Sequence, residues 1–365
     1  MTAAATVPDL DARTDRVGVG AVLRRNRWWM LRVAVLPIHM LVFALLAFFL
    51  VRLIPGDPAR QIAGPDATPE TYLAVREQLG LDGSIWSQLG AYLADLLRLD
   101  LGSSITTGRP VFTEIMARLP GTVELAVLAF VALVLVSLLL SVVVVLRPGG
   151  LGARIVSGYS QAAGALPDFV VGVIGIFLFY ATLRLVPAPN GRTRPGLREP
   201  DPITRFPLLD SALSGRFEVT SSILSHYLLP IAVLVVSLAP LLLKQLLGAL
   251  GPSAEDRSTL FRVATGAPRR MVLASIYRRA LPPTIAVFGT IFGTLLGGAV
   301  ILEQLFGLGG LGSYAVDAVD GLDLTALQGT LVLVAAISMI VYLLVDLTTM
   351  LLDARRRPGA QGSGS

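Results

Sequence analysis

A basic segment at residues 264–283, ATGAPRRMVLASIYRRALPP, lies between two of the most apolar stretches of the chain. Val272, Ile276 and Ala280 recur at helical spacing and are flanked by arginines. Such a helix can rest on anionic lipid, with its arginines on phosphates and its apolar face at the acyl boundary. It can also insert its apolar face into another protein, and the pattern alone leaves both open.

Local signals around this segment predict two helices joined by a tight turn. SAED at 253–256 resembles a capping box, so we expect the first helix to start at Ser253 and to run to about Thr265. Gly266 tolerates the left-handed conformation that ends many helices. Pro268 suits the first turn of the second helix, where its missing N–H removes no hydrogen bond.

Other chemistry is poorly supported. The chain has no cysteine and two histidines, His39 and His226, which argues against a metal site and excludes a cysteine nucleophile. A phosphate-binding loop of the common type needs a lysine, and the single lysine, Lys244, ends an apolar run. GLGGLG at 307–312 matches a dinucleotide fingerprint only superficially, because no strand precedes it. We therefore expect no catalytic residues, no metal site and no cofactor in this chain.

Composition places these segments in a membrane. Hydrophobic residues make up 54% of the 365, and the mean hydropathy is +0.71. A helix needs about 20 apolar residues to cross a bilayer. The chain is thus expected to be an all-α membrane protein with about six transmembrane helices, at 34–54, 122–146, 158–183, 227–249, 284–305 and 328–351.

Arginines predict the orientation of these spans. They are dense in residues 1–33, occur as Arg147 and Arg154 between the second and third spans, and follow the last span in DARRRP. Cytoplasmic flanks carry such an excess, so both termini are expected in the cytoplasm, and nucleic-acid binding is not indicated. The arginine-bearing loop 184–225 runs against this pattern, but long loops constrain topology less than short flanks.

The expected organisation has three parts. A basic cytoplasmic segment, 1–33, precedes a transmembrane domain, 34–352, and a low-complexity cytoplasmic tail, 353–365, follows it. Within the domain, 55–121 is expected to form two or three short amphipathic helices on the outer face. These helices either cap the bundle or receive a soluble external partner. Loop 184–225 is placed outside, and 253–283 in the cytoplasm.

Two features inside the spans concern packing. Gly289, Gly293 and Gly297 form one helical stripe that admits a close helix, either from this chain or from a second subunit. Asp346 lies within the last span, where an unpaired charge costs about 2.5–3.5 kcal/mol. We expect it to have a partner, and favour a structural hydrogen bond over a proton relay.

Seven sequence blocks, in order, resemble the inner-membrane permease subunits of dipeptide and oligopeptide ATP-binding-cassette (ABC) importers, specifically the first of their two permeases. The blocks are LVRLIPGDPA, QLGLDGSIWSQLGAYLADLLRLDLGSS, GRPVFTEIMARLPGTVELA, LPDFVVGV, RVATGAPRRMVL with RRALPP, GGAVILEQLFGLGGLG, and VYLLVDLTTMLLDARRR. The resemblance covers about residues 40–357. Thr265 stands where the family usually has lysine, and Gly309 where proline is common.

The resemblance implies a type I importer fold in a bacterial inner membrane, with 253–283 as the coupling element. Its apolar face would insert into an ATPase and its arginines would orient it. The implied coupling residues are Arg262, Ala264, Thr265, Gly266, Ala267, Pro268, Arg269, Arg270, Leu273, Ile276 and Tyr277.

The implied partners are a second homologous permease, two cytoplasmic ATPase subunits or domains that hold ATP and Mg²⁺, an external solute-binding protein and the lipid bilayer. Relatives handle peptides chiefly, and others are associated with nickel, glutathione or haem. The competing interpretations are a self-contained secondary transporter driven by an ion gradient, and a membrane-embedded enzyme. The chain shows neither the buried run of ionisable residues nor the clustered His, Asp and Glu set that these would need.

Overall fold

The computed structural model describes residues 19–162 and 164–352, with side chains described from 33 to 348. The expected termini at 1–18 and 353–365 therefore lie outside the described residues. Within them the fold is helical: α1 Val19–Val51, α2 Pro58–Ala63, α3 Pro69–Gln78, α4 Ile85–Leu97, α5 Val111–Leu146, α6 Leu151–Gln161, α7 Asp168–Gly175, η1 Ile176–Thr182, α8 Pro207–Leu213, α9 Phe217–Glu255, α10 Arg257–Ala264, α11 Arg269–Ile285, α12 Phe288–Leu305, α13 Leu311–Asp320 and α14 Leu324–Leu352.

Five helices in the described part are long and apolar enough to cross a bilayer: α1, α5, α9, α12 and α14. They confirm five of the six expected spans. α1, α5 and α9 begin ten or more residues before their expected starts, whereas α12 and α14 begin within four residues of theirs. The helix of α1 begins at Val19, inside the segment that was expected to precede the first span. Their length and apolar composition account for this agreement.

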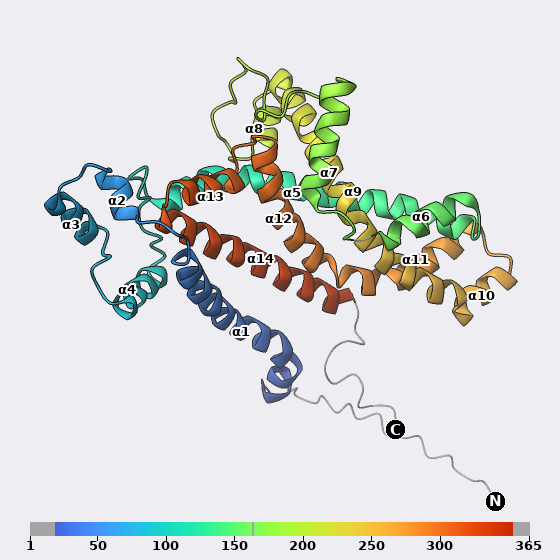
Figure 1. Ribbon diagram of the computed structural model, residues 1–365. Coiled ribbons are helices and arrows are strands. Elements are labelled where there is room, and N and C mark those ends of the chain that lie inside the picture. The colour runs from blue at the N-terminus through green and yellow to red at the C-terminus, as the bar shows by residue number, and fades with distance from the viewer. Residues whose placement is uncertain (1–18, 163, 353–365) are drawn as a thin grey trace, which may run out of the picture.

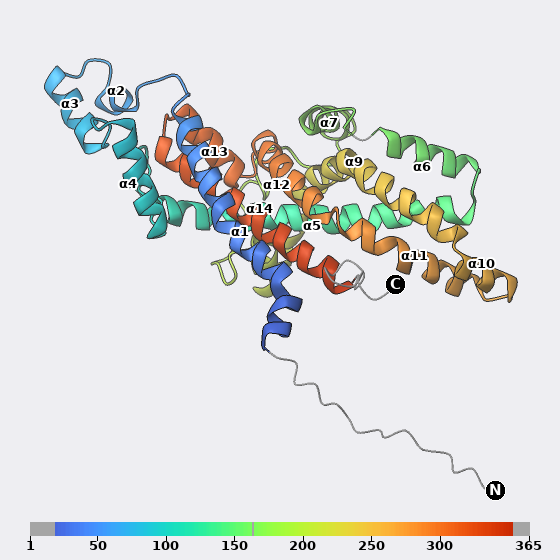
Figure 2. The same cartoon turned by 90° about the horizontal axis from the view of Figure 1, so that it is seen from below.

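The expected third span, 158–183, is not one helix. α6 ends at Gln161, and α7 begins only at Asp168, with Gly164 at φ +75° between them. Pro167 directly precedes α7, where it cannot continue a preceding helix. α7 and the π-helical turn η1 run across the direction of α5 and α6 in both views (Figures 1 and 2).

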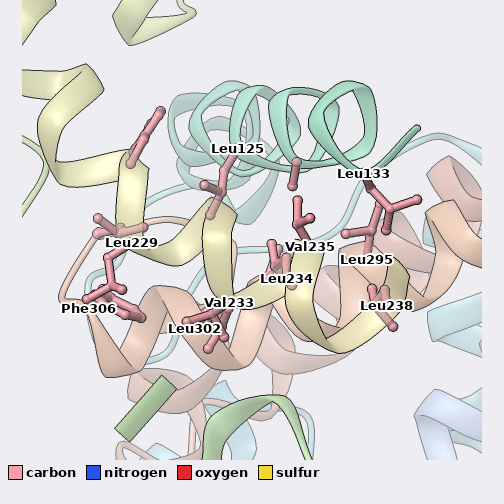
Figure 3. Close-up of a cluster of buried hydrophobic side chains, with 14 of the residues drawn as sticks. Leu125, Leu133, Leu229, Val233, Leu234, Val235, Leu238, Leu295, Leu302 and Phe306 are labelled. Atoms are coloured by element: carbon pink, nitrogen blue, oxygen red, sulfur yellow. The ribbon is translucent and has the colours of Figure 1, made fainter. Parts of the chain in front are cut away.

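Three helices form the core. α5, α9 and α12 pack together through buried leucines and valines, among them Leu125, Leu234 and Leu295, each with no exposed surface (Figure 3). α9 carries most of this surface, although Pro230, Pro240 and Pro252 lie inside it. Each proline removes one N–H donor from the helix, so α9 is expected to bend at these points.

The ends of the molecule differ in construction. Figure 1 shows α2, α3 and α4 gathered at one end and α10 at the opposite end. Three short helices lie within 55–121, where two or three were expected. Tyr92 and Leu93 of α4 pack on Ala44 and Val332, which joins this group to α1 and α14.

Two parts of the expected loops are helical. α13 follows GLGGLG, and α8 and the first turns of α9 occupy the second half of loop 184–225.

Candidate functional site

The basic segment forms two helices, α10 and α11, which we call the α10–α11 hairpin, residues 256–285. The capping-box signal predicted that the first helix starts at Ser253, but α10 begins at Arg257. α9 continues through Ser253, whose hydroxyl donates to the carbonyl of Ala249 at 2.7 Å. Asp256 is the cap instead, because its carboxylate accepts from the backbone N–H of Ser258 at 2.9 Å.

The turn of the hairpin is as predicted from glycine and proline. Gly266 has φ +72°, a left-handed conformation that glycine adopts without a steric penalty. The N–H of Ala267 donates to the carbonyl of Arg262, and that of Gly266 to Val263, which together form a Schellman motif. Pro268 caps α11, one residue before its first turn.

One arginine fastens the two helices of the hairpin together. Arg279 of α11 pairs with Asp256 at 2.7 Å and donates to the hydroxyl of Thr259 at 2.8 Å and to that of Ser258. The hydrogen bonds from the Ser258 hydroxyl and N–H, joined by the charge of Arg279, lower the pKa of Asp256. Sequence reasoning missed Arg279, because Asp256 lies 23 residues away and no local pattern links them.

The apolar side of α11 faces this chain. Ile276 is 5% exposed and packs with Leu246 and Leu250 of α9. The hydroxyl of Tyr277 lies 2.7 Å from that of Ser141 in α5. Ile276 and Tyr277, which were expected to insert into a partner, thus already have contacts within this chain. Leu273 is half-buried.

A different set of apolar side chains is exposed. Leu260, Phe261 and Val263 of α10 are 54%, 69% and 58% exposed, and Met271 of α11 is 48% exposed. We call these four residues, with the exposed arginines Arg262, Arg269 and Arg270 around them, the docking face. Exposed apolar groups next to unpaired cations are typical of a surface that binds another protein.

The remaining residues expected in the coupling site lie around the turn. Ala264, Thr265, Gly266 and Pro268 are exposed, and Ala267 is half-buried. The hydroxyl of Thr265 bonds only to the carbonyls of Phe261 and Arg262 in its own helix. The turn therefore presents backbone and small side chains beside the docking face.

Two glycines of the expected stripe pack inside this chain. A Cβ at Gly289 would lie 2.8 Å from the ring of Tyr342 in α14, and one at Gly293 would lie 3.4 Å from it. Gly297 has open space and is exposed. Asp346 lines a groove between α1 and α14. It has an interaction partner, as the sequence analysis expected.

At the other end of α12, a loop is built around a buried carboxylate. Glu303 is 1% exposed and accepts from the N–H of Gly312 at 2.7 Å, at the start of α13. The hydroxyl of Thr122 in α5 accepts from the N–H of Leu311 at 2.9 Å. We call residues 303–312 the α12–α13 junction. Carboxylate and hydroxyl together satisfy donors that a helix start leaves open.

Similar contacts fix the neighbouring loops. Glu124 of α5 accepts from the N–H groups of Leu208 and Leu209 at the start of α8. Arg192 donates to the carbonyl of Leu308 at 2.7 Å. The buried Asp323 accepts from the hydroxyls of Ser104 and Thr106 and from the N–H of Ala326. Except for Asp323 and Ala326, the partners in these contacts lie 84 to 219 residues apart in the sequence, so no local pattern predicts them.

These observations define a multi-pass helical membrane protein with rigid loops at one end of its helices and an exposed docking face at the other. Residues 134–358 match the family of binding-protein-dependent transport system inner membrane components. Residues 26–126 match the N-terminal part of such membrane components. The chain belongs to this family of ABC importer permeases, whose members are membrane subunits and not ATPases.

Named relatives align over most of their length. The chain is 33% identical to the probable D,D-dipeptide transport system permease protein DdpB of Escherichia coli, over 91% of this chain and 96% of that protein. It is 33% identical to the di/tripeptide transport system permease protein DppB of Pseudomonas aeruginosa, over 86% and 93%. With the dipeptide transport system permease protein DppB of E. coli the identity is 31%, over 86% and 93%.

Proposed function

We propose that this chain is one of two permease subunits of an importer for short peptides, and that its docking face binds a cytoplasmic ATPase. The relatives named above are permeases of dipeptide and tripeptide transport, and they align with nearly the whole chain. The single observation that carries the ATPase contact is the exposure of Leu260, Phe261 and Val263 at the tip of the hairpin.

The orientation follows from the arginines. Val145, two residues before Arg147, packs against the hairpin cluster around Ile276. The basic turn after α5 and the hairpin therefore lie on the same side of the bundle. Basic flanks are cytoplasmic in most multi-pass proteins. This assignment puts the docking face, both termini and the turn between α5 and α6 in the cytoplasm, with α2–α4 and loop 184–225 outside. Besides the five long helices, it requires a sixth crossing between the α5–α6 turn and loop 184–225, where α6, α7 and η1 lie.

The second permease subunit is supported by the surface of α12. Thr290, Thr294 and Gly297 are exposed at positions that follow one side of this helix. Hydroxyls and small residues on a spanning helix favour a neighbouring helix or a wet path over lipid. A solute-binding protein outside and two ATPases that hold ATP and Mg²⁺ complete the proposed assembly.

The docking face can be tested in proteoliposomes that contain the whole importer. Phe261→Ser should lower ATP-dependent uptake of a dipeptide about tenfold or more, because burying one such side chain contributes about 1.5–3 kcal/mol and 1.4 kcal/mol is tenfold. Leu97→Ser is the matched control, since Leu97 is 87% exposed at the opposite end of the molecule. Equal loss in both variants, or uptake by an ion gradient without ATPases, would contradict the proposal.

A further inference from the structure

A cavity of about 730 Å³ lies at the end of the molecule opposite the hairpin. Its walls come from parts distant in sequence: Arg52 after α1, the end of α3, one side of α4, the loop 100–108 and the first turns of α14. Its size falls within the range of small-molecule sites, roughly 300–1,000 Å³. Nothing in the proposed coupling or packing uses it.

One cation lines the cavity without a counter-ion. The guanidinium of Arg52 is half-buried and stacks 3.5 Å from the centre of the Phe48 ring. It donates to the carbonyl of Phe48 at 3.1 Å and to the side-chain oxygen of Gln88 at 2.8 Å. Among the residues that the structure describes, no carboxylate pairs with it. Arginine has five N–H donors, so three remain for an anion.

Carboxylates line the same cavity. Asp95 of α4 and Asp100 of the following loop are both exposed, and neither forms an ion pair within the described part of the chain. One oxygen of Asp100 accepts from the N–H of Gly102 at 2.8 Å, which fixes its direction. The cavity therefore presents charges of both signs that the protein itself leaves unpaired.

Two buried polar atoms in its wall also lack partners. The hydroxyl of Tyr92 and the amide nitrogen of Gln328 have no hydrogen-bond partner among the described residues, and Gln328 is 8% exposed. Both residues line the cavity. A buried polar group without a partner is rare in native proteins. Neither atom has accessible surface of its own in this structure, so only a rearranged side chain would present it to the cavity.

We propose that this outer cavity binds a small zwitterion, namely a free amino acid or a short peptide with both termini charged. Arg52 would take the carboxylate, and Asp95 and Asp100 the ammonium group. The inference that the ligand is a zwitterion depends only on the charges in the cavity. The choice of a peptide as the natural ligand rests on the proposed function. The site holds solute on the permease itself, before the solute enters the membrane.

The test is direct binding to the full-length chain in lipid nanodiscs, measured by calorimetry with alanyl-alanine. The zwitterion should bind, and N-acetyl-alanyl-alanine amide, which has neither terminal charge, should not. Arg52→Met should weaken binding about tenfold or more, because charge-assisted hydrogen bonds are the strong ones. Arg98→Gln is the matched control, since Arg98 is exposed at the end of α4 and does not line the cavity.

A second variant guards against misfolding. Ala91 lines the cavity from α4 and is exposed, so Ala91→Trp fills the space without removing a polar group. It should abolish binding while the elution profile and melting temperature stay unchanged. Equal binding of both peptides, or full binding by Ala91→Trp, overturns the inference.

The two proposals fail separately. Peptide uptake by the whole importer without binding at this cavity leaves the proposed function standing and removes the inference. Binding at the cavity in a chain that supports no uptake leaves the inference standing and removes the proposed function.

Discussion

The α12–α13 junction and the α10–α11 hairpin use the same device in opposite settings. In both, a carboxylate accepts hydrogen bonds from the N–H groups that begin a helix: Glu303 for α13 and Asp256 for α10. Glu303 is almost completely buried, whereas Asp256 is exposed. A buried cap cannot exchange its partners for water, so the junction is fixed. An exposed cap can exchange its hydrogen bonds for bonds to water with little change in free energy, which leaves the hairpin free to adjust to a partner.

The largest loss of stability is expected from a substitution that adds atoms inside the α12–α13 junction. A Cβ at Gly312 would lie within 2.7 Å of Val300 Cα and against the Val300 carbonyl, and backbone cannot move aside as a side chain can. Gly312→Ala should therefore destabilise the protein by about 3 kcal/mol or more. Gly297→Ala, at a position of α12 with open space around it, should stay within about 0.5 kcal/mol. Melting temperatures in nanodiscs measure both, and similar values would show that the junction yields.

Removing the buried carboxylate of Asp323, between α13 and α14, should cause the next largest loss of stability. Asp323→Ala leaves the hydroxyls of Ser104 and Thr106 and the N–H of Ala326 without their acceptor. We expect a loss of about 2–3 kcal/mol in the free energy of unfolding, because hydrogen bonds to charged groups are the strong ones. Asp320→Ala, at an exposed position of α13, should change stability little. The same denaturation measurement tests both, and equal losses would contradict the fixed outer loops.

At the hairpin, the corresponding change should act locally. Arg279→Ala removes the link between α10 and α11, so hydrogen exchange at residues 257–266 should become several-fold faster while the melting temperature changes little. Arg278→Ala is the control, since Arg278 is exposed and contributes no bond of this kind. A large fall in melting temperature for Arg279→Ala would show that the hairpin is as fixed as the junction.

The smallest effect concerns pH. The folded state lowers the pKa of Asp256 below that of the unfolded chain, which is about 4. The stabilisation of the hairpin by this group is therefore present above about pH 4 and is lost as the pH falls through the lower folded pKa. The ratio of exchange rates between Asp256→Asn and the unchanged protein should exceed one at neutral pH and fall toward one as the pH drops below the folded pKa of Asp256. A ratio independent of pH would rule out this role of Asp256.

Sequence patterns located what depends on local chemistry. Apolar runs gave five spans, and glycine and proline gave the turn at Gly266 and Pro268, because conformation at these residues depends on their own atoms. The break between α6 and α7 was missed, since an apolar run reads the same whether or not it is one helix. The apolar stripe of α11 was found, but its partner was not, because only the fold reveals that α9 and α5 cover Ile276 and Tyr277.

The length of α9 has a mechanical consequence. This helix runs from the end of loop 184–225 to Asp256 at the base of the hairpin, through the core that α5 and α12 share. One continuous helix therefore connects the base of the hairpin to the centre of the bundle, and a displacement of the hairpin would be transmitted along it. Pro230, Pro240 and Pro252 lie inside this helix, and each removes an N–H donor, so these are the positions at which α9 is expected to bend.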